Sequence, residues 1–93
     1  AHITGDGLDN LLRLHAQVGY EVSDPLPVPP VFDLIARLGD VAEDEMYDVF
    51  NMGLGLVAVV PGDRAGDATA LLAAHHPGTR RIGSVIPERK IVR

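Results

Sequence analysis

The residues best suited to chemistry lie at the start of the chain, in the stretch His2-Ile3-Thr4-Gly5-Asp6-Gly7. This stretch joins an extended segment to a helix that we predict over residues 5–15 from the helical spacing of its apolar residues. The first N–H groups of a helix lack internal partners and lie at the positive end of its dipole. Because glycines let an anion come close to such groups, the pattern predicts a phosphate site. Turns of this kind also begin helices that bind no ligand.

Asp6 adds a carboxylate to this candidate site. It could accept hydrogen bonds from the N–H groups of the helix and so compete with a phosphate, in which case Asp6 or Thr4 caps the helix. It could instead reach the ligand through Mg²⁺, or accept hydrogen bonds from hydroxyl or amine groups of the ligand. The residues leave these three roles open. Gly19 is the expected end of the helix.

A second candidate site is Asn51-Met52-Gly53-Leu54-Gly55, which enters an apolar run that continues to Val60. We interpret residues 54–60 as a central strand that is covered on both faces, or covered on one face by something outside this chain. Asn51 at its mouth could present an amide to a ligand, and Gly53 could let a ligand or another backbone approach. The alternative is a bulged strand entry in which Asn51 satisfies local backbone groups.

Other catalytic chemistry finds little support in the sequence. The absence of cysteine excludes disulfides, thiolate catalysis and cysteine-based zinc sites. Neither Ser23 nor Ser84 lies in a Gly-x-Ser-x-Gly elbow. His75 and His76 are adjacent, so on a helix they point about 100° apart and do not converge on a metal. The acidic residues of 40–48 are typical of a solvated helix start rather than of a metal site. We therefore predict no metal ligands in this chain.

Composition narrows the possible partners. The chain has 93 residues, enough for one small domain, and a net charge of −5. An acidic chain with few aromatic residues is not expected to bind nucleic acid. Its late basic residues, which form a solvated edge more readily than a phosphate site, are Arg80, Arg81, Arg89, Lys90 and Arg93. No run of about 18 apolar residues predicts a membrane span. With neither an initiator Met nor a signal peptide, we expect a cytoplasmic chain that continues a longer protein.

The remaining elements are predicted from periodicity and from the positions of glycine and proline. Further helices are expected over 31–38, with Pro30 in the first turn and Gly39 as terminator, over 41–50, and over 64–76 with Asp63 as N-cap. Strands are expected at 20–23, 54–60, 81–86 and 91–92. Four prolines make residues 24–30 irregular. These elements favour an α+β fold in which helices pack against a mostly antiparallel four-stranded sheet.

Taken together, the two candidate stretches resemble the C-terminal domain of the phosphoribosylformylglycinamidine cyclo-ligases, also called aminoimidazole ribonucleotide synthetases. The resemblance covers essentially the whole chain. Its motifs are, in order, His2-Ile3-Thr4-Gly5-Asp6-Gly7, Pro29-Pro30-Val31-Phe32, the block Glu45-Met46-Tyr47-Asp48-Val49-Phe50-Asn51-Met52-Gly53-Leu54-Gly55, Val59-Val60-Pro61 and Ile82-Gly83-Ser84-Val85. Many members carry three consecutive glycines where this chain has Gly5-Asp6-Gly7.

The resemblance implies a role in the fifth step of purine biosynthesis. ATP activates the formyl amide oxygen of formylglycinamidine ribonucleotide, a ring nitrogen attacks, and phosphate leaves. His2 would be the catalytic residue. The residues that would bind substrate or phosphate are Thr4, Gly5, Asp6, Gly7, Asn51 and Gly53. Residues 1–93 would be the C-terminal domain of a two-domain, homodimeric enzyme.

The missing N-terminal domain would, by the same resemblance, bind most of the ATP and Mg²⁺, so that the 93-residue chain alone is inactive. The alternatives are two. The chain could belong to another superfamily member, of the selenophosphate synthetase, thiamine-phosphate kinase, hydrogenase-maturation or formylglycinamidine ribonucleotide synthetase type. It could also be a stand-alone α+β interaction module.

Overall fold

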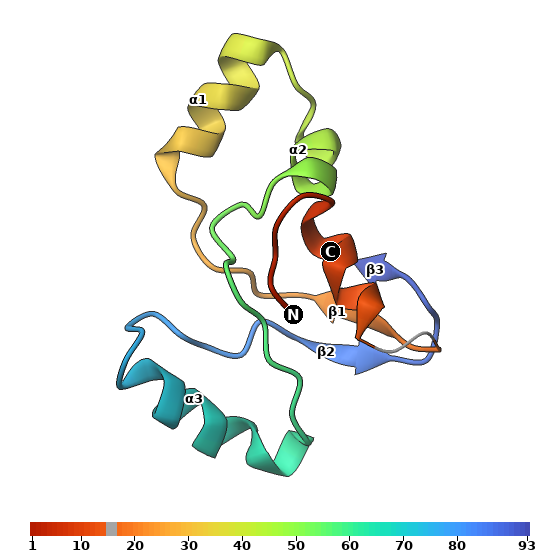
Figure 1. The fold of residues 1–93 in the computed structure, drawn as a ribbon, viewed down its shortest axis with the longest axis vertical. Helices are drawn as coiled ribbons and strands as arrows, with labels where there is room; N and C mark the ends of the chain where they lie inside the picture. Colours follow the sequence, from red (N-terminus) through yellow and green to blue (C-terminus); the bar gives the residue numbers. More distant parts are fainter. Residues whose placement is uncertain (15–16) are drawn as a thin grey trace.

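The fold contains a three-stranded mixed sheet, built from strands near the two ends of the sequence (Figure 1). The computed structural model describes residues 1–14 and 17–93. Strand β1 (Gly19–Val22) is flanked by β2 (Gly83–Ile86), which runs antiparallel to it, and by β3 (Ile91–Val92), which runs parallel. The strands predicted near residues 20, 81 and 91 are thus confirmed. Together with the helices they make an α+β domain, also as predicted.

Helices occupy most of the remaining predicted positions. Their bounds are η1 (Gly7–Arg13), α1 (Pro30–Gly39), α2 (Glu43–Val49), η2 (Gly62–Arg64) and α3 (Ala65–Ala73), where η denotes a 3-10 helix. Pro30 stands in the first turn of α1, as its fixed φ angle favours. The left-handed residue that ends α1 is Asp40 rather than the predicted Gly39.

The buried core is small and gathers around η1 and β1. Its apolar cluster comprises Ile3, Leu8, Leu11, Tyr20, Val22 and Leu54. In contrast, α1 and α3 have no buried residue, and Figure 1 shows both helices projecting from the sheet toward opposite ends of the molecule. The molecule measures 42 × 32 × 18 Å, which makes it a thin layer with apolar surface left uncovered.

The predicted central strand over residues 54–60 is wrong. Among the described residues, this segment pairs only with residues 1–3, through a single antiparallel bridge between His2 and Leu56. Leu56 is 70% exposed and Val59 is 47% exposed. A strand becomes central only when other strands form hydrogen bonds along both of its edges. In the described part of the chain, one edge of residues 54–60 pairs with residues 1–3 and the other edge pairs with no strand. The sheet is therefore three-stranded and mixed instead of four-stranded and mostly antiparallel.

Three helix boundaries also differ from expectation. The first helix is a 3-10 segment confined to Gly7–Arg13, and the predicted face residue His15 lies outside the described residues. Gly19 does not end this helix but begins β1, where a Cβ would overlap the backbone of the segment joining β2 to β3. Asp63 lies inside η2 and makes no capping hydrogen bond, and α3 ends at Ala73 because the chain turns before residue 76.

Candidate functional site

The two stretches singled out in the sequence lie side by side. The Ile3 N–H donates to the Gly55 carbonyl oxygen at 2.9 Å, and the Ala1 carbonyl accepts from the Val57 N–H at 2.9 Å. Gly7 then packs against the end of α2. The two stretches therefore lie next to each other, although about 45 residues of sequence separate them, and we refer to their exposed groups as the candidate surface.

His2 and Thr4 share the outer face of this surface. Ile3 between them is 1% exposed and belongs to the core, whereas His2 and Thr4 are exposed. Successive side chains of an extended segment point to opposite sides. The imidazole of His2 and the hydroxyl of Thr4 therefore emerge on the same side, away from the core.

Asn10, which the sequence reasoning did not single out, holds the first loop together. Its side chain is buried, at 3% exposure. Its Nδ2 donates to the carbonyl oxygens of Gly7 at 2.8 Å and Gly5 at 2.9 Å, and lies 3.3 Å from that of Thr4. The sequence did carry a signal for this role of Asn10, namely a polar residue placed among the leucines that follow the loop. A buried amide requires partners, and here the loop carbonyls provide them.

Asp6 forms an ion pair on the surface. Its Oδ2 lies 2.8 Å from a guanidinium nitrogen of Arg13, and both side chains are well exposed. Asp6 itself has a left-handed backbone with φ of 77° and makes no side-chain cap to η1. Of the two predicted caps, Asp6 rather than Thr4 occupies the N-cap position, but the Asp6 carboxylate does not bond the N–H groups of the helix. Its possible contact with a ligand or with Mg²⁺ remains a prediction.

The glycines of the site fall into two kinds. Gly7 and Gly53 have φ of 54° and 96°, and a Cβ would overlap the Tyr47 carbonyl at position 7 and lie 2.6 Å from Pro29 Cδ at position 53. Folding alone therefore accounts for these two. Gly5 has no left-handed φ, and a Cβ there would meet no atom within 4 Å among the described residues. The bare backbone at Gly5 leaves room for a ligand to approach.

Asn51 stabilises the turn after α2. Its Oδ1 accepts from the Gly53 N–H at 2.9 Å, and its carbonyl oxygen accepts from the Leu54 N–H at 3.0 Å. This confirms that Asn51 satisfies local backbone groups, as an Asx turn does. The side-chain Nδ2 of Asn51 is the part still suited to a ligand, and that role remains a prediction.

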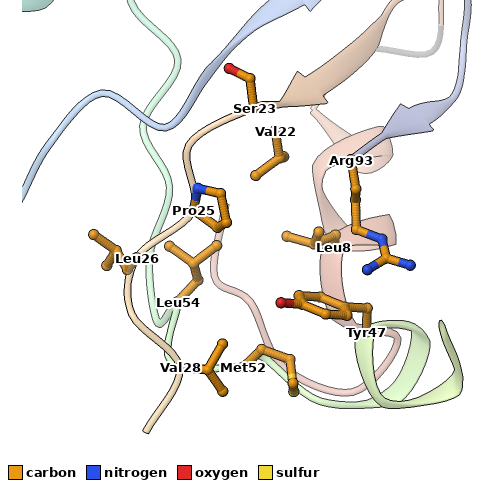
Figure 2. Close-up of a pocket in the computed structure, with 10 residues that line it drawn as sticks. All are labelled: Leu8, Val22, Ser23, Pro25, Leu26, Val28, Tyr47, Met52, Leu54 and Arg93. Atoms are coloured by element: carbon orange, nitrogen blue, oxygen red, sulfur yellow. The ribbon is translucent and has the colours of Figure 1, made fainter. Parts of the chain in front are cut away.

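Two hollows lie close to the candidate surface. Met52 and Leu54 of the second candidate stretch line the smaller one, but the residues predicted to bind substrate line neither. The smaller, of about 140 Å³, is apolar apart from one edge, where the Arg93 guanidinium stands 4.1 Å from the centre of the Tyr47 ring (Figure 2). The larger, of about 700 Å³, is an open apolar groove along residues 56–59. The predicted site is therefore an open face. Because ligand sites are concave, binding at this face would require a second wall.

Three of the five late basic residues make side-chain contacts within the described part of the chain, and among them Arg81 donates to the Gly83 carbonyl at 3.3 Å. Arg80 lies 3.3 Å from a carboxylate oxygen of Asp24 and also donates to the Pro25 carbonyl. Arg93 lies 2.5 Å from a carboxylate oxygen of Asp44, at the start of α2. These contacts favour the interpretation of a solvated edge over that of a phosphate site.

Residues 1–14 and 17–93 contain neither a cluster of metal ligands nor a membrane-spanning helix. No three His, Cys, Asp or Glu side chains in this part of the chain gather into a set of metal ligands. None of its helices combines the length and apolarity that crossing a membrane requires.

Comparison of the sequence with known proteins places this chain in a family. The family model described as AIR synthase related protein, C-terminal domain, matches residues 1–93. The chain is 45% identical to the phosphoribosylformylglycinamidine cyclo-ligase of Methanopyrus kandleri over 75 residues. These residues cover 81% of this chain and 22% of that protein. It is 45% identical over 94 residues to the enzyme of the same name from Bifidobacterium animalis subsp. lactis, covering 95% of this chain and 26% of that protein.

A third relative gives the same result. The phosphoribosylformylglycinamidine cyclo-ligase of Bordetella avium is 40% identical over 93 residues, which cover 96% of this chain and 26% of that protein. The resemblance drawn from the motifs is thereby confirmed. The chain spans about a quarter of the length of these relatives.

Proposed function

Because this chain belongs to the family of AIR synthase related C-terminal domains, we propose that it forms one wall of the active-site cleft of a phosphoribosylformylglycinamidine cyclo-ligase. The parent enzyme would use ATP to close the imidazole ring of aminoimidazole ribonucleotide in purine biosynthesis. The observation that carries this proposal is the joining of the two candidate stretches into one face, by the hydrogen bond from Ile3 to Gly55. The identity to named cyclo-ligases supports it.

The exposed groups on this face suggest which part of the reaction it serves. His2 and Thr4 offer an imidazole and a hydroxyl on the same side, and Gly5 offers backbone that a phosphate can approach. We assign His2 to the reacting part of the substrate, and Thr4, Gly5 and Asp6 to its phosphate end. Gly7, Asn51 and Gly53 would shape the floor of the cleft, since their backbone and side-chain groups are engaged in the turns.

ATP and Mg²⁺ would be bound mainly by the rest of the parent. The Asp6 carboxylate is the acidic group on the candidate face, and it already pairs with Arg13. A lone paired carboxylate does not make a Mg²⁺ site, because Mg²⁺ needs several oxygen ligands in near-octahedral geometry. The residues of this chain thus fit a substrate wall better than a metal centre.

The rest of the parent would also cover the uncovered apolar surface. Residues 54–60 are apolar at nearly every position, yet Leu56 is 70% exposed. Leu56 also lines the open apolar groove along residues 56–59, and contiguous apolar surface is typical of an interaction site. We propose that residues 1–93 are the C-terminal domain of a two-domain, cytoplasmic, homodimeric enzyme and that its other parts dock here.

The test is an assay of the parent protein with formylglycinamidine ribonucleotide, ATP and Mg²⁺. We expect one aminoimidazole ribonucleotide for each ATP hydrolysed, and no turnover by the 93-residue chain alone, because phosphoryl transfer needs a metal-bearing cradle. Turnover by the isolated chain would contradict the proposal that residues 1–93 form only one wall of the active-site cleft. ATP-dependent phosphorylation of another substrate by the parent would indicate a different member of the superfamily.

A further inference from the structure

Asn10 is the buried polar side chain of the region that the structure describes, and it serves a loop of the proposed cleft. Its amide has two hydrogens to donate. They go to the carbonyl oxygens of Gly7 and Gly5, at 2.8 and 2.9 Å, with Thr4 more distant at 3.3 Å. One side chain thus holds two peptide groups of the loop, those that follow Gly5 and Gly7, while the Gly7 N–H closes the loop by donating to the Thr4 carbonyl at 2.9 Å.

These hydrogen bonds determine which way the loop presents its donors. In a trans peptide, the carbonyl of one residue and the N–H of the next point in opposite directions. Because Asn10 draws the Gly5 carbonyl toward the core, the N–H of Asp6 is turned away from the core. The weaker contact with Thr4 does the same for the N–H of Gly5. Neither N–H donates to a backbone carbonyl in the described part of the chain.

We propose that Asn10 is a positioning residue, which turns the N–H groups of Gly5 and Asp6 outward so that they bind the phosphate of the ribonucleotide substrate. This inference rests on the proposed function. Asn10 touches the loop and not the substrate, so it acts through Gly5 and Asp6. Gly5 carries no Cβ and has open space around it, which lets the phosphate reach both N–H groups.

The test uses the parent enzyme with two substitutions at this position and one beside it. Asn10→Asp keeps the shape of the side chain but removes both donors, whereas Asn10→Ser keeps one donor in a smaller side chain. Leu11→Ala is the control, because Leu11 is 1% exposed, packs in the same core and has no polar group. For each variant, kcat, the KM for ribonucleotide and the KM for ATP are measured well below its unfolding temperature.

We expect Asn10→Asp to raise the KM for the ribonucleotide about tenfold or more, the loss of roughly one well-placed hydrogen bond. Asn10→Ser should raise it less, and the KM for ATP should stay within about twofold in both. Deuterium exchange in a peptide covering residues 4–9 should quicken in Asn10→Asp. Leu11→Ala should lower the unfolding temperature while leaving the KM for ribonucleotide within about twofold.

Two results would overturn the role of Asn10. One is an unchanged KM and unchanged exchange in Asn10→Asp, and the other is an equal rise of KM in Leu11→Ala. Failure of the proposed function would look different, because the wild-type parent would then lack cyclo-ligase activity. In that case the exchange of residues 4–9 still decides whether Asn10 holds the loop. If Asn10→Asp does not fold, Asn10→Ser against Leu11→Ala makes the same comparison.

Discussion

Gly7 lies directly against the carbonyl oxygen of Tyr47, with no room for a side chain between them. A Cβ at this position would also lie 3.1 Å from the Phe50 carbonyl, and the φ of Gly7 is 54°. We therefore expect Gly7→Ala to destabilise the parent by about 2 kcal/mol or more, through both backbone strain and overlap. Urea unfolding measures this, and a change below about 0.5 kcal/mol would show that the contact is not this close.

Gly5→Ala should behave in the opposite way. A Cβ at Gly5 meets no described atom within 4 Å, so stability should change by less than about 0.5 kcal/mol. If a phosphate approaches Gly5, the added methyl group should lower kcat/KM about tenfold or more. Gly62→Ala is the matched control, because its Cβ would also lie in open space, far from the loop. Equal activity of the two variants would exclude close approach at Gly5.

Sequence alone could predict this loop because its signals are local. The succession of an extended residue, small residues and leucines indicates a turn into a helix whatever surrounds it. What could not be predicted is how the glycines differ. Gly7 is required by a carbonyl of α2, about 40 residues away in sequence, and Gly5 by no contact among the described residues. Asn10 was missed because its partners depend on the tertiary fold. A polar residue on a predicted helix does not indicate which carbonyls its side chain will face.

The predicted sheet failed where local pattern and tertiary partners disagree. Apolar residues at 54–60 predict a buried strand, and propensity there favours one. A strand nevertheless exists only through its neighbours, and within the described part of the chain this segment pairs only with residues 1–3. By contrast, the short strand Ile91–Val92 was predicted correctly because β1 offers it a free edge.

Replacing the exposed polar side chains of the loop should affect catalysis much more than stability. In the parent, His2→Ala and Thr4→Ala should each lower kcat/KM about tenfold to hundredfold. Both residues are exposed, so the free energy of unfolding should change by less than about 1 kcal/mol. Thr79→Ala serves as control, because the Thr79 hydroxyl donates to the His76 carbonyl in the turn that follows α3, far along the chain from the loop. Full activity in both loop variants would contradict the assignment of this face to the cleft.

The contacts of Arg93 should be unequal in strength. Its guanidinium stacks over Tyr47 at 4.1 Å, while its ion pair with Asp44 involves a carboxylate side chain that is 91% exposed. Exposed ion pairs contribute little, and a cation–π contact contributes about 0.5–1 kcal/mol. We expect Arg93→Ala to destabilise by about 1 kcal/mol and Asp44→Ala by less than about 0.5 kcal/mol. Thermal unfolding of both variants at low and high salt measures this, and a larger loss in Asp44→Ala would reverse the ranking.

The exposed side chain of Leu56 tests the proposal that another part of the parent docks at residues 54–60. Leu56 and Leu71 are each 70% exposed, but only Leu56 lines the open apolar groove, whereas Leu71 stands on α3. If the rest of the parent covers the groove, Leu56→Asp buries an unpaired charge there and should destabilise the parent by about 2 kcal/mol or more. Leu71→Asp should change stability by less than about 1 kcal/mol, because a charge on an exposed helix face stays in water. Equal, small effects of the two substitutions would mean that the groove faces solvent in the parent, and the proposed docking of its other parts at residues 54–60 would then be wrong.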